Sequence, residues 1–138
     1  MLVILSIKPK YCKKIIAGEK RYEFRKRFPK NIELVYMYAT SPVKKVVGEF
    51  KVGEVVEDEP IILWRKFRTY AGVDKNEFFK YYEGCNKGCA IKIEEVRTFA
   101  PIDPKIIVSG FKPPQSYRYT NIPFFNISFG INKSMHSF

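Results

Sequence analysis

Gly18-Glu19-Lys20-Arg21-Tyr22-Glu23-Phe24-Arg25-Lys26-Arg27 combines five cationic residues, two acids and two aromatics within ten positions. The glycine is typical of the end of a preceding helix, and the residues after it alternate as in a β-strand. In a strand, Tyr22 and Phe24 would point to one face, whereas the other face would carry Arg21, Glu23, Arg25 and Arg27. We therefore predict a strand over Lys20–Arg27 that packs its aromatic face on a core and presents guanidinium groups around one carboxylate.

Two interpretations of this charged face remain open. Charged residues on an edge strand prevent pairing with other chains, and that role alone would explain them. The alternative is a surface for an anionic partner. The chain has a formal net charge of +11, and its first thirty residues contain ten lysines and arginines against only Glu19 and Glu23. This asymmetry favours a polyanion, and nucleic acid or a nucleotide is the common choice.

Length and composition indicate one domain with a substantial core. The chain has 138 residues, of which 46% are hydrophobic, and no run approaches the ~20 apolar residues of a membrane span. The short apolar start, Met1–Ile7, lacks a preceding basic region and is typical of a buried strand rather than a signal peptide. We expect a cytoplasmic protein without a membrane partner, with a domain over residues 1–120 and a C-terminal extension or tail over 121–138.

The cysteines do not indicate disulfides or a metal. Their odd number, at Cys12, Cys85 and Cys89, argues against a disulfide framework in a chain without an export signal. A structural zinc site would need two more ligands beside Cys85 and Cys89, and only Cys12 and His136, in the expected tail, remain. We expect no metal and no cofactor.

Apolar periodicity and turn residues predict an α+β chain. Strands are expected at Leu2–Ile7, Lys20–Arg27, Glu33–Ala39, Val46–Val56 and Cys89–Val96, and helices after Pro9, Pro60 and Asp74. Gly48 and Gly53 suggest bulges or sharp coiling, as a small closed barrel requires. The segment 111–119 should be extended because of its prolines, and the last seven residues should fray.

Chemical motifs leave a lysine and a glutamate as the only catalytic candidates. The sequence lacks glycine-rich phosphate loops, a usable catalytic triad and a clear pair of carboxylates for sugar chemistry. Lys20 beside Glu23 could act as a nucleophile or acid/base if burial lowered its pKa. Strict alternation puts the two on opposite faces, so they converge only if Lys20 precedes the strand. Glu23 could also hold Arg21 or Arg25, and Arg25 would then present its planar fork to a phosphate or base edge.

These residues resemble the opening of an ASCH domain. The family signature Gly-x-Lys-x-x-Glu-x-Arg is matched by Gly18, Lys20, Glu23 and Arg25. The flanking segments Leu5–Pro9 and Ile16–Arg25 are also similar to the family, as are Tyr38–Pro42, Val46–Gly48 and Pro113–Tyr119. The resemblance covers roughly residues 2–120.

The resemblance implies a PUA-like fold, which is a small mixed β-barrel flanked by short helices, with a cleft for RNA or a modified nucleoside. Some members resemble amidohydrolases of acetylated cytidine that use a lysine, a threonine three residues later and a downstream glutamate. Here Lys20 matches the lysine, Glu23 stands at the threonine position, and the loop at 68–72 has no acid before Asp74. Other members are described as ribonucleases.

The sequence thus predicts a module that binds RNA or a modified nucleoside through a basic cleft. The expected contacts are Lys20, Arg21, Glu23, Arg25, Arg27, Thr40, Ser41, Gln115 and Ser116, with Lys20 and Glu23 as candidates for catalysis. The alternatives are an enzyme acting on a modified nucleoside or an RNA backbone, and a regulatory module that binds a small effector or a protein. Whether the chain is an enzyme, its exact ligand and its oligomeric state stay open at this point.

Overall fold

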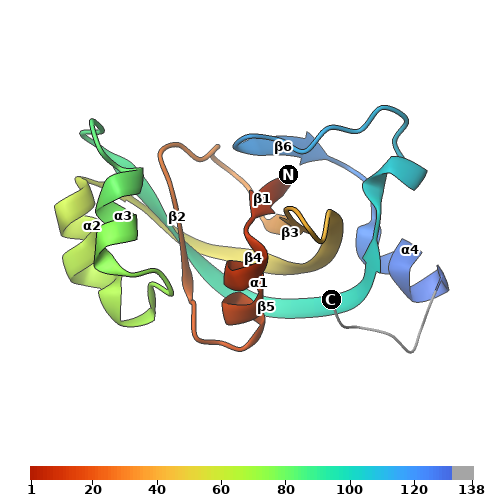
Figure 1. The fold of residues 1–138 in the computed structure, drawn as a ribbon, viewed down its shortest axis with the longest axis horizontal. Coiled ribbons are helices and arrows are strands. Elements are labelled where there is room, and N and C mark those ends of the chain that lie inside the picture. The colour runs from red at the N-terminus through yellow and green to blue at the C-terminus, as the bar shows by residue number, and fades with distance from the viewer. Residues whose placement is uncertain (132–138) are drawn as a thin grey trace.

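The computed structural model describes residues 1–131, which form a mixed six-stranded sheet with short helices around it (Figure 1). The strands follow the order β2-β5-β4-β3-β1-β6. Only β1 and β3 are parallel, and the other neighbours are antiparallel. The strands are β1 (Leu2–Ile7), β2 (Tyr22–Arg25), β3 (Leu34–Ala39), β4 (Lys45–Asp58), β5 (Gly88–Ile102) and β6 (Tyr117–Thr120). The helices are α1 (Pro9–Ile16), α2 (Pro60–Phe67), η1 (Arg68–Tyr70), α3 (Lys75–Tyr81), η2 (Pro104–Ile106) and α4 (Phe124–Ile131). The predicted α+β class is confirmed.

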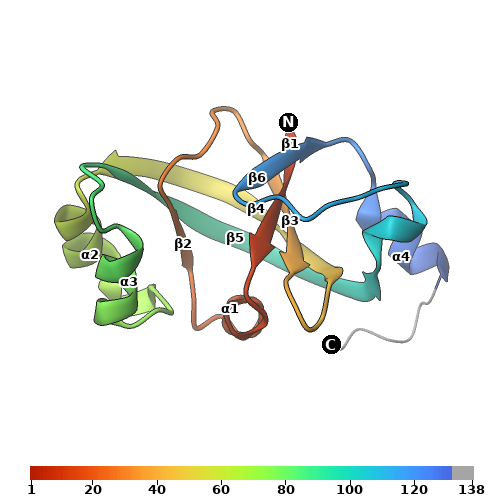
Figure 2. The ribbon, with the colours of Figure 1, turned by 45° about the horizontal axis from the view of Figure 1, so that its top comes forward.

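The two long strands β4 and β5 run through the molecule and carry helices at both ends. Figure 2 shows α2 and α3 over one end of these strands and α4 at the other. Each end has its own apolar cluster under its helices: Phe24 of β2 packs with Leu63 of α2 and Phe78 of α3, and Tyr36 and Phe99 of the sheet belong to a cluster with Phe124 of α4. A third cluster between them contains most of the buried side chains of β1 and β3.

Strand β1 is buried on both faces, which explains its nearly continuous apolar sequence. Val3, Leu5 and Ile7 belong to the central cluster, whereas Ile4 points to the cluster under α4. Helix α1 starts at Pro9, packs Cys12 and Ile15 on the central cluster and connects β1 to β2. As expected, the chain then turns at Gly18, whose φ of 79° is a left-handed conformation.

The strand predicted over Lys20–Arg27 is shorter in the structure, where β2 comprises Tyr22–Arg25. At its start, the Lys20 amide donates to the Lys14 carbonyl of α1 at 3.1 Å, so Lys20 belongs to the turn. At its end, the Arg25 carbonyl accepts a hydrogen bond from the Tyr82 hydroxyl at 2.9 Å. Within β2 the predicted facing holds, since Phe24 packs edge-on against Phe78 while the Glu23–Arg25 pair lies on the opposite face. Arg21 and Arg27, which we predicted on that charged face, lie outside the strand.

The sheet is not closed into the barrel that we expected. Within residues 1–131, β2 and β6 are the two edges, and their backbones do not pair with each other. The bulges are present nevertheless: the register between β4 and its neighbours shifts near Gly48 and Gly53. The sheet is therefore coiled as the glycines suggest, but its first and last strands are not joined by a backbone ladder.

Strand β5 is longer than the predicted Cys89–Val96 and continues to Ile102, which pairs with Val46 of β4. The three cysteines are free thiols, and burial raises the pKa of Cys12 to about 12. Among residues 1–131, no helix has both the length and the apolar character needed to cross a bilayer. His136 and the end that we expected to fray lie outside the described residues.

Candidate functional site

Lys20 is held in the protein interior by the turn that precedes β2. Its side chain is only 2% exposed, and its ammonium group donates to the Ala71 carbonyl at 2.6 Å. Nζ also lies 3.4 Å from Oε1 of Glu23, and the rings of Tyr11 and Phe24 lie 5.3 and 5.2 Å from it. An ammonium group has three N–H donors, of which one is committed to Ala71 and a second faces Glu23, so one has no acceptor among residues 1–131.

Lys20 precedes β2, which is the condition under which we expected its side chain to converge with that of Glu23, and the two side chains do converge. Glu23 is 6% exposed and lies between two cations. Its Oε2 accepts hydrogen bonds from Nη2 and Nε of Arg25 at 2.7 and 3.2 Å, while its Oε1 faces Lys20. Both oxygens of this carboxylate are therefore engaged, as a buried charge requires.

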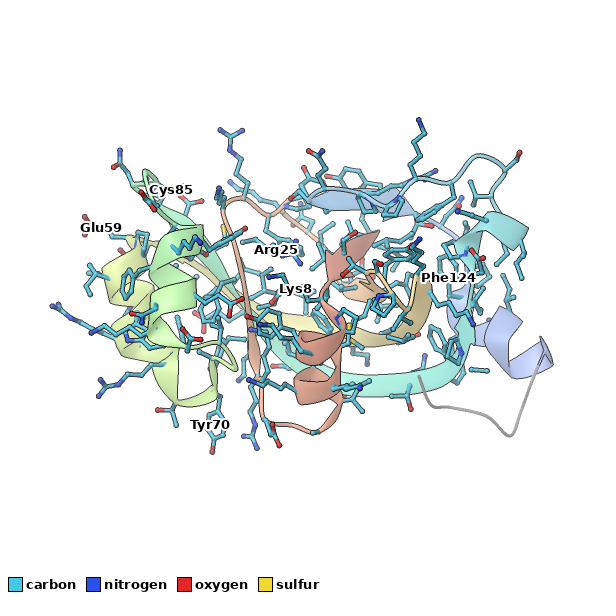
Figure 3. All side chains as sticks on the ribbon, viewed as in Figure 1. Lys8, Arg25, Glu59, Tyr70, Cys85 and Phe124 are labelled. Carbon is cyan, nitrogen blue, oxygen red and sulfur yellow. The ribbon has the colours of Figure 1, made fainter. Side chains whose placement is uncertain are left out.

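Arg25 connects three segments of the chain. Besides Glu23, its Nη2 donates to the Ser6 carbonyl of β1 at 2.8 Å, and its Nη1 lies 3.5 Å from the Ser116 carbonyl next to β6. In Figure 3 the side chain of Arg25 extends from β2 toward β1. The Nε–Nη2 edge that we expected to face a ligand is thus occupied by Glu23, and Nη1 is the donor left with only one long contact.

These side chains form the floor of a cavity of about 190 Å³. Its wall is partly apolar, with Ile7, Phe24, Val73 and Phe78. Its polar lining consists of Ser6, Lys8, Tyr11, Lys20, Glu23, Arg25, Glu77 and Tyr81. Three cations and two carboxylates make the hollow positive overall. The buried hydroxyl of Tyr11 has no hydrogen bond of good geometry, although the Glu77 carboxylate is close enough to influence its titration.

The electrostatics of the floor keep Glu23 ionised. Burial alone would raise the pKa of Glu23, but Arg25 and then Lys20 lower it below its usual value. Burial also lowers the pKa of Lys20, against the opposing effect of Glu23. Burial, followed by the nearby Glu77, raises the pKa of Tyr11. The cavity thus combines a fixed anion, a lysine that releases its proton more readily than a free lysine does, and a neutral phenol.

The other residues that we predicted for the site do not line the cavity. The guanidinium of Arg21 lies 4.3 Å from the centre of the Tyr70 ring, in a separate groove beside Lys92. Arg27, Gln115 and Ser116 are exposed, and Ser116 reaches the site through its carbonyl. Thr40 and Ser41 lie in the β3–β4 turn, where the Thr40 amide donates to the Ile7 carbonyl. The structure therefore brings together Lys20, Glu23 and Arg25 but not the complete predicted set.

Sequence reasoning missed five polar lining residues, of which Glu77 and Tyr81 are the most informative. Both lie on α3, whose first turn is capped by the Asp74 side chain as predicted. The Asp74/Glu77 spacing signalled a helix start, and it also places a carboxylate at the cavity, bridged to Lys8 and Lys10 at 3.5 and 3.4 Å. The remaining three are Ser6, Lys8 and Tyr11. Among residues 1–131, no three His, Cys, Asp or Glu side chains cluster as a metal site would need.

Comparison with known proteins identifies the family of this chain. The ASCH domain family matches residues 5–103. A protein of Zymomonas mobilis named ASCH domain-containing ribonuclease is 31% identical over 118 residues, which cover 82% of this chain and 80% of that protein. The crystal structure of ASCH from Zymomonas mobilis superimposes with a TM-score of 0.84 at 27% identity and covers 94% of both chains. The large ribosomal subunit protein uL22 of Ureaplasma parvum is 37% identical over 91 residues, 64% of this chain but 29% of that protein. The chain belongs to the ASCH domain family.

Proposed function

We propose that this protein binds RNA by taking one unpaired or modified nucleotide into the cavity above Lys20, Glu23 and Arg25. The observation that carries the proposal is the buried floor, where two cations surround one ionised carboxylate under aromatic walls. Such charges are costly to bury, and they are retained where they orient a polar ligand.

The size of the cavity supports a small, ring-sized ligand. A volume of about 190 Å³ corresponds to roughly six water molecules at ~30 Å³ each, below the 300–1,000 Å³ of typical pockets for drug-sized ligands. Tyr81 is 41% exposed and is suited to stack on a base, whereas the buried rings of Phe24 and Phe78 offer apolar contact in the wall. The free N–H of Lys20, the Tyr11 hydroxyl and Nη1 of Arg25 would recognise its polar edge.

Binding of short RNAs by variants tests this function. We expect affinity to fall steeply with salt and Arg25→Ala to weaken binding by at least tenfold, because it removes a donor and releases Glu23. The control is Lys13→Ala, which removes an exposed cation of α1 outside the cavity and should change affinity less than threefold. Fluorescence anisotropy, with circular dichroism to verify folding, gives the comparison. Millimolar binding by the wild type at low salt would refute the proposal.

A second candidate function, cleavage of the RNA backbone or hydrolysis of a modified base, is favoured by Lys20. Burial lowers the pKa of its ammonium group, so Lys20 gives up a proton more readily than an ordinary lysine, as a group that transfers protons must. The relative from Zymomonas mobilis, which is named a ribonuclease, supports the same direction.

Incubation with RNA and with acetylated cytidine separates enzyme from binding module. If Lys20 transfers a proton, Lys20→Met should abolish turnover while the protein stays folded and Lys13→Ala should keep full activity. The pH profile of the wild-type rate should rise with deprotonation of an acid whose pKa lies below that of free lysine. Absence of product from both substrates after long incubation would leave binding as the function.

A further inference from the structure

A second hollow adjoins the cavity and has a different character. It measures about 850 Å³ and is lined by Lys8, Lys10, Lys26, Asp74, Asn76, Glu77, Lys80 and Tyr81, which together we call the lysine groove. Three of its residues, Lys8, Glu77 and Tyr81, also line the cavity. The two hollows are therefore adjacent, with these three side chains at their boundary.

The lysine groove carries excess positive charge. Its four lysines come from the start of α1, the residue after β2 and the last turn of α3, and face two carboxylates. Glu77 is shared by Lys8 and Lys10, and Asp74 caps α3. Lys26 and Lys80 are exposed and have no ion pair within residues 1–131. The groove thus has a net charge of +2, with two cations free to meet phosphates.

An aromatic side chain marks the junction of the two hollows. Tyr81 is 41% exposed, lines both, and has the Lys26 ammonium 5.2 Å from its ring centre. Its hydroxyl is fixed by the Lys26 amide at 3.2 Å. Cations along a groove combined with an exposed, fixed aromatic ring are the features by which proteins hold single-stranded nucleic acid.

We propose that the lysine groove holds the sugar–phosphate backbone next to the nucleotide in the cavity, so that the ligand is a single strand several nucleotides long. This inference rests on the proposed function and extends it, because a free nucleoside would leave the lysine groove empty. A double helix should bind more weakly, since a paired base must leave its stack before it enters the cavity.

The test compares two double variants that remove the same charge. Lys26→Gln with Lys80→Gln alters the lysine groove. Lys45→Gln with Lys105→Gln alters exposed lysines beside the cluster under α4, at the other end of the sheet. Affinity is measured by anisotropy for a fluorescein-labelled RNA dodecamer across a salt series, and by titration for nucleoside monophosphates. Circular dichroism verifies that both variants fold.

Each phosphate neutralised on a single strand contributes ~0.7 to the slope of log affinity against log salt. We expect the groove variant to reduce this slope by about 1.4. Its loss of dodecamer affinity relative to the wild type should therefore be about 25-fold larger at 0.1 M salt than at 1 M. The affinity that the groove variant loses relative to the wild type should be at least ten times larger for the dodecamer than for nucleoside monophosphates. It should also exceed the affinity that the control variant loses for the dodecamer. Equal losses in the two variants would overturn the proposal, as would competition by a dodecamer duplex as strong as by the single strand.

The two proposals fail in different ways. If the wild type does not bind the dodecamer, or Arg25→Ala binds it with full affinity, the proposed function is wrong. If Arg25→Ala loses binding but the groove variant keeps both its slope and its affinity, the cavity binds RNA and only the lysine groove is misassigned.

Discussion

Gly72 lies against the stem of Lys20, and no other residue type fits there. Its φ is 66°, and an added Cβ would lie 2.4 Å from Cβ of Lys20. We predict that Gly72→Ala destabilises the protein by more than the ~1–2 kcal/mol of a left-handed alanine, because the new methyl group must also displace Lys20. Urea denaturation measures this loss, and RNA affinity should fall with it.

Gly84→Ala is the matched control for this variant. Gly84 has a φ of 78°, but nothing lies within 4 Å of an added Cβ, so only the backbone cost applies. Equal losses of stability in the two variants would mean that contact with Lys20 is unimportant.

The ion pair between Glu23 and Arg25 predicts a specific dependence of stability on pH. The pKa of Glu23 is lower in the folded chain than in the unfolded one. Its contribution to stability is therefore complete above its ordinary pKa of about 4.3 and is lost as pH falls through the folded value. We expect Arg25→Ala to lower the free energy of unfolding by about 3 kcal/mol at pH 7, because it leaves a buried carboxylate without its main partner.

At pH 3 the difference between wild type and Arg25→Ala should shrink, since a protonated Glu23 needs no cation. Urea denaturation at both pH values gives the comparison. Arg27→Ala, which removes an exposed arginine two residues later, should cost less than 0.5 kcal/mol at either pH. A loss in Arg25→Ala that is the same at pH 3 and pH 7 would show that packing, and not charge, is responsible.

At the scale of elements, local sequence patterns predicted whether a segment forms a helix or a strand. Contacts between residues distant in sequence decided where that helix or strand ends. The alternation of Tyr22 and Phe24 with Glu23 and Arg25 specified the faces of β2. Its limits depend on partners distant in sequence, such as Tyr82 at the Arg25 carbonyl, which no local pattern contains. The same holds for the end of β5, where pairing of Ile102 with Val46 extends the strand.

The residues of the candidate site also fall into two groups, those that the local sequence predicted and those that only the fold brings to the cavity. Lys20, Glu23 and Arg25 are within six residues, so a turn before β2 suffices to bring them together. Glu77 and Tyr81 reach the same cavity from α3, more than fifty residues later. Their participation follows from how β5 and β2 pair and how α3 packs on Phe24, and it could be seen only with the fold in hand.

At the scale of the whole molecule, α4 belongs to the folded core. Phe124 is fully buried and packs edge-on against Tyr36 with ring centres 5.0 Å apart. We predict that Phe124→Ala lowers the free energy of unfolding by about 3 kcal/mol in a single cooperative transition. Because Phe124 does not line the cavity, the folded variant should bind RNA with an affinity within twofold of that of the wild type.

Asn126→Ala, at an exposed position on the same helix, is the control and should cost less than 0.5 kcal/mol. Thermal and urea unfolding provide the measurement. An unchanged stability of Phe124→Ala would mean that residues after 120 are a loosely attached extension.

The bridge that Arg25 forms between the two sheet edges has a consequence for motion. Separating β2 from β1 and from the segment before β6 breaks no backbone ladder, and among the hydrogen bonds of the described residues it breaks those of Arg25 to Ser6 and Ser116. At ~1.5–3 kcal/mol for each charged hydrogen bond, breaking these two bonds costs about 3–6 kcal/mol, at the low end of the ~5–15 kcal/mol of global unfolding. The domain can therefore open locally between these segments while β4 and β5 stay paired. Amide hydrogens beside Ser116 should then exchange with solvent sooner than those of β4. A ligand bound at Lys20, Glu23 and Arg25 would hold these segments together and slow this exchange.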